Sequence, residues 1–267
     1  MSPLGRGAAV VVAVFLIAAL AGAASADQVN WNARGNDAVR RGELAEALVD
    51  FTRATEQIPN DPVAWYNRAL VYSRLGKNGA ALADAQRSVS VNPLFDEGRA
   101  LVARLQEELG EYDAALVSIE RALAVRSGEV SYHLARANLL RLLHRTPDAI
   151  AEYEDALRRD ARSAPALHGL AEVRLEQQRD REALALLNRY VAVAPDDPDV
   201  SVVVAGLLAK TGRPQDALTW IAAHASTDPR MTDYNVRALL LLGRTAAAEA
   251  ALPASARGES AYRASLR

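Results

Sequence analysis

Small and apolar residues return along this chain at a fixed spacing of 34 residues. Windows of that length, counted from Gln28, follow one another six times over residues 28–231 without insertion or deletion. A fixed period of this length is typical of stacked helical hairpins. Two antiparallel helices pack closely only where neither presents a large side chain, which predicts a helix–helix contact at each recurring small residue. Position 8 of the window holds Gly35, Ala69, Ala103, Ala137, Ala171 and Ala205, position 20 holds Ala47, Ala81, Ala115, Ala149, Ala183 and Ala217, and the more variable position 24 holds Phe51, Ala85, Ile119, Tyr153, Leu187 and Ile221.

Glycine and proline mark where the predicted helices end. Glycine at position 15 supplies the left-handed residue that ends the first helix of each pair. Proline at position 32 ends the second helix, and aspartates near the window joints are suited to cap the next one. These residues are Gly42, Gly76, Gly110 and Gly212, then Pro59, Pro93, Pro195 and Pro229, and finally Asp61, Asp96, Asp197 and Asp199.

The pattern resembles the tetratricopeptide repeat. The resemblance covers residues 28–231 and implies an all-α fold, an α-solenoid in which helix-turn-helix repeats wind into a right-handed superhelix with the first helices on the concave side. It weakens toward the C-terminus, where position 4 changes from tryptophan to Arg99, His133, Leu167 and Ser201. The residues that carry it are Trp31, Gly35, Ala47, Phe51, Ala54 and Pro59, with Trp65, Ala69, Tyr72, Ala81 and Pro93.

Both ends of the chain depart from the period. Residues 1–26 have the form of a secretory signal: Arg6, an apolar run and a small-x-small site at Ala24–Ala26. Cleavage would make the protein periplasmic or secreted; the alternative is an uncleaved inner-membrane anchor over residues 8–24. Residues 232–252 predict a shortened seventh helix pair. Residues 253–267 form a tail, with 260–267 as a candidate capping helix.

The resemblance also indicates which residues face the groove. In the family, solvent-facing concave positions fall on the first helix of each pair, and asparagine, arginine and tyrosine there are suited to bind a peptide. The alternative is that each is simply a solvated polar residue. The candidate partner-binding residues are Asn32, Asn36, Arg40, Tyr66, Asn67, Arg74, Arg104, Asn138, Arg141 and His168, and the same positions also include Glu97, Glu107, Glu172 and Glu176.

Chaperone-binding members of the family hold a C-terminal carboxylate with two lysines, two asparagines and an arginine. At the matching positions this chain keeps the asparagines, as Asn36 and Asn67. The three cationic places hold Asn32, Glu97 and Leu101. Without cations, and with a glutamate that repels a carboxylate, the sequence does not predict such a clamp.

Composition narrows the possible functions further. The chain has no cysteine and 5% aromatic residues, and its 31 basic and 33 acidic residues give a formal net charge of −2. Neither nucleic acid nor an anionic membrane is favoured by that balance. Of the four histidines only His168 is expected in the groove, and no metal-binding, phosphate-binding or nucleophile motif occurs. The sequence predicts no enzyme, no cofactor and no metal.

The sequence therefore predicts a non-catalytic protein-interaction scaffold in the cell envelope that binds a peptide or helix of an unidentified partner protein. Two alternatives stay open. The apolar windows at Val200–Leu208 and Val236–Leu242 suggest a self-assembling structural subunit, a homo-oligomer, unless the tail buries them. An accessory role in polysaccharide or protein export is the other, although few aromatic rings are available for sugar stacking.

Overall fold

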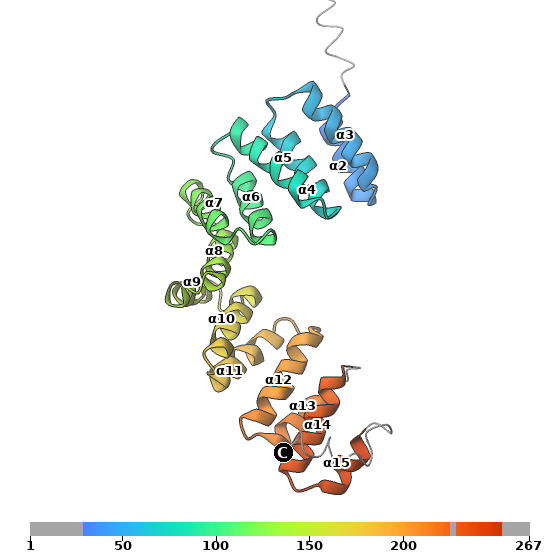
Figure 1. The fold of residues 1–267 in the computed structure, drawn as a ribbon, viewed down its shortest axis with the longest axis vertical. Coiled ribbons are helices and arrows are strands. Elements are labelled where there is room, and N and C mark those ends of the chain that lie inside the picture. Colours follow the sequence, from blue (N-terminus) through green and yellow to red (C-terminus); the bar gives the residue numbers. More distant parts are fainter. Residues whose placement is uncertain (1–28, 225–227, 253–267) are drawn as a thin grey trace, which may run out of the picture. The chain divides into compact units, whose positions relative to one another are not determined.

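The computed structural model describes residues 29–224 and 228–252, which form fourteen α-helices and no strand (Figure 1). Signal-like residues 1–26 and the tail 253–267 lie outside the described residues. The fold is the predicted all-α helical repeat. The chain divides into two compact units: the first ends at Glu111, and the second begins at Tyr112. The first unit contains α2 (Trp31–Arg41), α3 (Leu44–Gln57), α4 (Pro62–Arg74), α5 (Asn78–Val91) and α6 (Asp96–Glu108). The second contains α7 (Tyr112–Val125), α8 (Val130–Leu142), α9 (Thr146–Arg159), α10 (Ala164–Glu176), α11 (Asp180–Val191), α12 (Pro198–Lys210), α13 (Pro214–Ala223), α14 (Pro229–Leu241) and α15 (Thr245–Ala251).

The small residues at positions 8 and 20 lie in the core. All six alanines at position 20 are completely buried, and so are Ala69, Ala137, Ala171 and Ala205 at position 8. Gly35 has no room for a side chain, because a Cβ there would lie 2.7 Å from the ring of Phe51. Close approach of the helices therefore depends on the absence of larger side chains.

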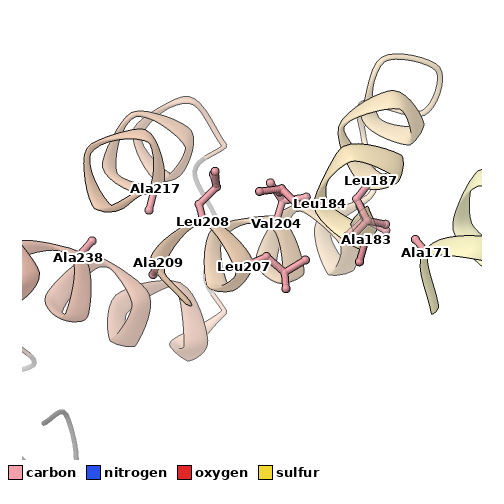
Figure 2. Packing of buried hydrophobic residues seen from close by; sticks show 11 residues of the cluster. Ala171, Ala183, Leu184, Leu187, Val204, Leu207, Leu208, Ala209, Ala217 and Ala238 are labelled. Carbon is pink, nitrogen blue, oxygen red and sulfur yellow. The ribbon is translucent and has the colours of Figure 1, made fainter. Parts of the chain in front are cut away.

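The apolar windows near the C-terminus are largely buried within the chain. Val204, Leu207 and Leu208 of α12 pack with Leu184 and Leu187 of α11 (Figure 2). The same cluster includes Ala217 of α13 and Ala238 of α14. Further along, Val236 and Leu239 of α14 pack with Ala248 and Leu252. The last hairpin thus covers the apolar face of the helices before it, as a solenoid end requires.

Two boundaries near the C-terminus differ from the sequence prediction. Pro229 does not end the helix before it but is the first residue of α14, which Asp228 caps by accepting from the amide of Arg230. Helix α13 ends at Ala223 and is shorter than the other second helices of the period. Proline suits the first turn of a helix as well as the residues after one, so the residue type alone did not decide between the two.

The predicted aspartate caps are half right. Asp61 and Asp197 cap α4 and α12 by accepting from the amides of Val63 and Val200. Asp96 is instead the first residue of α6, and Asp199 lies inside the first turn of α12. Both still lie near a helix N-terminus, where a negative charge interacts favourably with the helix dipole.

A charged pair joins the two helices of three hairpins, and the sequence pattern had not revealed it. Arg68 of α4 contacts Asp84 of α5 at 2.6 Å, with both side chains largely buried. The same repeat positions, 7 and 23, pair Arg34 with Asp50 at 3.1 Å, and Arg136 with Glu152. Arg68 also donates to Thr55 of the preceding hairpin, so it links neighbouring pairs.

In three successive windows position 4 makes the same hydrogen bond although its residue changes. The Trp65 indole donates to the carbonyl of Pro59 at 2.8 Å, and the Arg99 guanidinium donates to Pro93 at 3.0 Å. His133 Nε2 lies 2.9 Å from the equivalent carbonyl, that of Ser127. Leu167 cannot donate, and there Arg189 of α11 donates to the Ala161 carbonyl at 3.0 Å. The contact thus satisfies a turn carbonyl that a helix end would otherwise leave unpaired.

Left-handed residues end the first helices as predicted, including two that are not glycine. Gly42, Gly76, Gly110 and Gly212 have φ between 70° and 80°. His144 and Gln178 at the same position have φ of 57° and 59°. A side chain makes this conformation unfavourable.

Gln178→Gly should therefore stabilise the protein by about 0.5–1 kcal/mol, because glycine adopts positive φ without steric cost. The matched control is the neighbouring Gln177→Gly, where φ is −80° and glycine should cost about 0.5–1 kcal/mol. Urea unfolding followed by circular dichroism measures both. Changes of the same sign would contradict the assignment.

The Arg68–Asp84 pair gives a second stability prediction. Asp84→Ala should lower the free energy of unfolding by about 3–5 kcal/mol, because it leaves Arg68 largely buried without its partner. Asp155→Ala is the control: Asp155 pairs with Arg158 and Arg159 at the surface, where the loss should be much smaller because solvent screens exposed ion pairs. Equal losses in urea melts would refute a special role for the buried pair.

Candidate functional site

Within each unit most first helices of successive pairs contact one another, although among the described residues α10 and α12 do not. In the first unit α2 packs beside α4, and α4 beside α6; in the second, α8 packs beside α10, and α12 beside α14 (Figure 1). Between second helices of successive pairs within the same unit, no such contact occurs in the described residues. The first helices therefore lie on the inner side of each unit, and we call their solvent-facing surface the inner face.

The inner face of the first unit presents three polar side chains with no internal partner. Asn36 of α2 and Arg74 of α4 are exposed, and Asn67 of α4 is half-buried. None of the three has a hydrogen bond or ion pair to another described residue. Their donors and acceptors are available to a bound molecule.

Three other predicted residues of this unit are engaged within the chain. Asn32 donates to Asp61 at 2.7 Å. Arg40 is paired with Asp37 on its own helix, and Arg104 contacts Glu108 at 2.7 Å. Binding a partner through these three side chains would require that internal contacts be exchanged for new ones.

Tyr66 adds an aromatic surface beside these polar groups. Its ring meets Phe95 edge-on, with centroids 5.3 Å apart. Burial, followed by the charge of Glu97, raises the pKa of the Tyr66 phenol. Aromatic rings held in this way are rigid contact surfaces for a partner.

In the second unit a buried tyrosine of a second helix contacts a residue of the inner face. Tyr153 of α9 is completely buried, and its hydroxyl donates to the side-chain oxygen of Asn138 on α8. Its ring also covers Gly169 of α10, where a Cβ would lie only 2.5 Å away. The sequence pattern placed Tyr153 among the apolar residues that fill space between pairs; its contact with Asn138 needed the structure.

Arg141 bridges α8 and α10. Its guanidinium lies 3.0 Å from Glu172 and 2.8 Å from Glu176, both on α10. Burial lowers the pKa of Arg141, whereas the hydrogen bond to Glu176 and the charge of Glu172 raise it, with a net rise above the ordinary value. Arg141 is thus a crosslink between first helices and is not free to bind an anion.

His168 completes the predicted set, on the same helix as the two glutamates. Its Nδ1 lies 4.0 Å from Glu172, and its ring centroid is 5.5 Å from that of Tyr190. Tyr190 donates to Asp197 at 2.7 Å, and this hydrogen bond lowers the pKa of Asp197. The structure therefore brings Asn138, Arg141 and His168 onto neighbouring helices, within one unit.

The described residues contain no group of three histidine or acidic side chains placed to hold a metal. A cavity of about 440 Å³ opens at the turn between α10 and α11, but its Arg179 and Lys210 are paired with Glu182 and Asp180. Over 29–224 and 228–252, no helix has the length and apolar character needed to cross a membrane.

The stacked hairpins define a helical-repeat protein with an open inner face. Family models described as "Tetratricopeptide repeat" match residues 51–83, 95–165 and 140–205. The chain belongs to the tetratricopeptide repeat family.

Known relatives agree with this assignment. The chain is similar to Hsp70-Hsp90 organizing protein 2 of Arabidopsis thaliana, at 31% identity over 90 residues that cover 34% of this chain and 16% of that protein. It is similar to DnaJ homolog subfamily C member 7 of Mus musculus, at 27% identity over 80% of this chain and 38% of that protein. The chain thus spans well under half of these relatives.

Solved structures show the same fold. A tetratricopeptide repeat protein from Parabacteroides merdae ATCC 43184 matches with a TM-score of 0.64 and 18% identity, over 88% of this chain and 96% of that one. Tetratricopeptide repeat proteins generally mediate protein–protein interactions.

The buried phenol of Tyr153 gives a pH prediction. Burial raises its pKa to about 12, although the charge of Arg141 opposes the rise. The neutral phenol is therefore favoured in the folded chain; its stabilising contribution is complete below the ordinary pKa of 10.0 and is lost as the pH rises to about 12. The difference in phenolate absorbance between the parent and Tyr153→Phe should titrate near pH 12. A difference curve centred at 10 would contradict the proposed environment.

Proposed function

We propose that this protein is a non-catalytic scaffold of the cell envelope that binds an extended segment of a partner protein along the inner face of its first helices. The proposal combines the family's general role in protein interaction with the polar groups on that face. Export to the envelope is proposed from the signal-like residues 1–26.

The observation that carries the proposal is the set of unpartnered side chains on α2 and α4. Asn36 and Asn67 each offer a donor and an acceptor, which suits a peptide backbone whatever its sequence. Arg74 offers a charged donor on the same surface. Since α2 and α4 pack side by side, one extended segment of a partner can contact all three residues.

The chemistry of this face disfavours one class of ligand. The Arabidopsis relative is named for Hsp70 and Hsp90, but the carboxylate clamp of chaperone-binding repeats lacks its cations here. Of the three cationic places, Leu101 is buried and Asn32 is engaged with Asp61. Glu97 would repel a carboxylate. We therefore propose an internal segment of the partner as the ligand, and not a C-terminal carboxylate.

Self-assembly through the C-terminal windows is the weaker alternative. Val204, Leu207 and Leu208 are at most 5% exposed, so α12 has little apolar surface to offer a second copy. Leu241 of α14 is 57% exposed, but a single exposed leucine is ordinary at a protein surface. Burial of the apolar windows thus favours the scaffold.

A pull-down tests the scaffold proposal. The triple variant Asn36→Ala/Asn67→Ala/Arg74→Ala should recover at least about tenfold less partner from an envelope extract than the parent, because a few central residues dominate the binding energy of an interface.

The control variant changes exposed polar residues on second helices: Gln57→Ala/Gln86→Ala/Arg121→Ala. It should recover as much partner as the parent. Equal recovery by the parent and the Asn36/Asn67/Arg74 variant, with both folded by circular dichroism, would rule out this face as the binding site.

A further inference from the structure

The inner face of α8 and α10 is organised differently from that of the first unit. There Asn36, Asn67 and Arg74 lack internal partners, whereas here the polar side chains are held by one another and by a buried residue. Asn138 and Arg141 come from α8, Glu172 and Glu176 from α10, and Tyr153 from α9.

Tyr153 fixes which end of the Asn138 amide is available. Its hydroxyl donates to Asn138 Oδ1, so that oxygen is already engaged. The amide nitrogen of Asn138 has no acceptor among the described residues. With Oδ1 already accepting from Tyr153, the N–H donors are the groups of the held amide that lack any partner, and a backbone carbonyl of a bound segment is the matching acceptor.

Arg141 in turn fixes the two glutamates. It contacts Oε2 of Glu172 and Oε1 of Glu176, one oxygen from each carboxylate. The second oxygen of each carboxylate remains, on side chains that are 39% and 49% exposed. Two carboxylates around one guanidinium leave a local charge of −1. Because these side chains are already restrained, less rotamer entropy is lost when a ligand binds.

The surroundings add to the negative charge. His168 lies 4.0 Å from Glu172 and its ring is 5.5 Å from that of Tyr190, whose hydroxyl donates to the carboxylate of Asp197 at 2.7 Å. The single guanidinium in the network is already shared between two acceptors, so an acidic segment would find no free cation there. Charge complementarity therefore selects a positively charged occupant.

We propose that Asn138, Glu172 and Glu176 form a subsite for an extended, basic segment of the partner protein. Asn138 donates to a backbone carbonyl of that segment, and the two glutamates accept from a lysine or arginine side chain. Tyr153 is a positioning residue, since it touches Asn138 and not the ligand. The inference rests on the proposed scaffold function and specifies the charge of the partner.

Two fluorescein-labelled decapeptides test the subsite by fluorescence anisotropy with the full chain, one alternating glycine and lysine, the other glycine and glutamate. The lysine peptide should bind at least about tenfold more tightly, and added salt should weaken it, because the attraction is between exposed charges. Glu172→Gln/Glu176→Gln should reduce its affinity by about tenfold.

The matched control is Glu154→Gln/Glu182→Gln. These two glutamates also flank an arginine of α10, Arg174, at 3.5 and 3.2 Å, but they come from the second helices α9 and α11. The charge change is the same in both variants, so a loss specific to Glu172 and Glu176 locates the site. An equal loss of affinity in both variants would mean that only the net charge of the protein matters, and it would overturn the proposal.

Tyr153→Phe keeps the ring over Gly169 and removes only the hydroxyl. It should lower the affinity for the lysine peptide by about three- to tenfold while the preference for lysine over glutamate persists, since the glutamates are untouched. A purely structural role would lower the melting temperature and leave affinity unchanged, and that result would overturn the positioning role.

Equal binding of the two peptides, or of neither, would overturn the subsite. This failure is distinct from failure of the scaffold proposal, which the pull-down judges through residues of the other unit.

Discussion

Close approach of the two helices in a hairpin is the constraint on which the rest of this fold depends. A hairpin of this size cannot bury its own apolar surface, so each must offer one face to its neighbour and the other to the next pair. That double packing requires small residues where the helices approach one another. Six completely buried alanines at one repeat position meet this requirement. Larger side chains then fill the spaces between pairs: Phe51 packs in a cluster with Val71 of α4, and Tyr153 lies against Gly169 of α10.

This constraint is also the part of the structure that the sequence predicts best. Residue size is visible in the sequence, and a requirement for small residues repeats with the hairpin. The starts of α4, α6, α8, α10 and α12 keep the 34-residue spacing of the windows. The left-handed turn was equally predictable from glycine. His144 and Gln178 keep the same positive φ at this repeat position, although glycine adopts it more readily.

Polar contacts were harder to predict, because different residues satisfy the same physical need. The turn carbonyl between pairs receives a donor from tryptophan, arginine or histidine, and once from another helix, through Arg189. In the sequence, this change of residue type at position 4 looks like a loss of the family motif, although the hydrogen bond to the carbonyl is kept. The pairing of Arg68 with Asp84 likewise cannot be predicted from the sequence unless one knows which sides of α4 and α5 are in contact. At the inner face, the sequence named Asn138 and Arg141 as candidates but could not show that Tyr153 and two glutamates contact them.

The two inner faces illustrate what such a scaffold leaves open to variation. Contacts that set the hairpin geometry lie between helices and in the turns, so the solvent-facing side of the first helices carries few structural obligations. In the first unit this freedom leaves Asn36, Asn67 and Arg74 unpartnered, and such side chains adapt to a ligand at the cost of rotamer entropy. In the second unit Arg141 and Tyr153 remove that freedom before a partner arrives. A surface restrained in advance discriminates between ligands by charge and geometry more sharply than an adaptable one, because a mismatched ligand cannot be accommodated by rearrangement. On this argument the first unit supplies general affinity for an extended chain, and the face of α8 and α10 supplies selectivity for its charge.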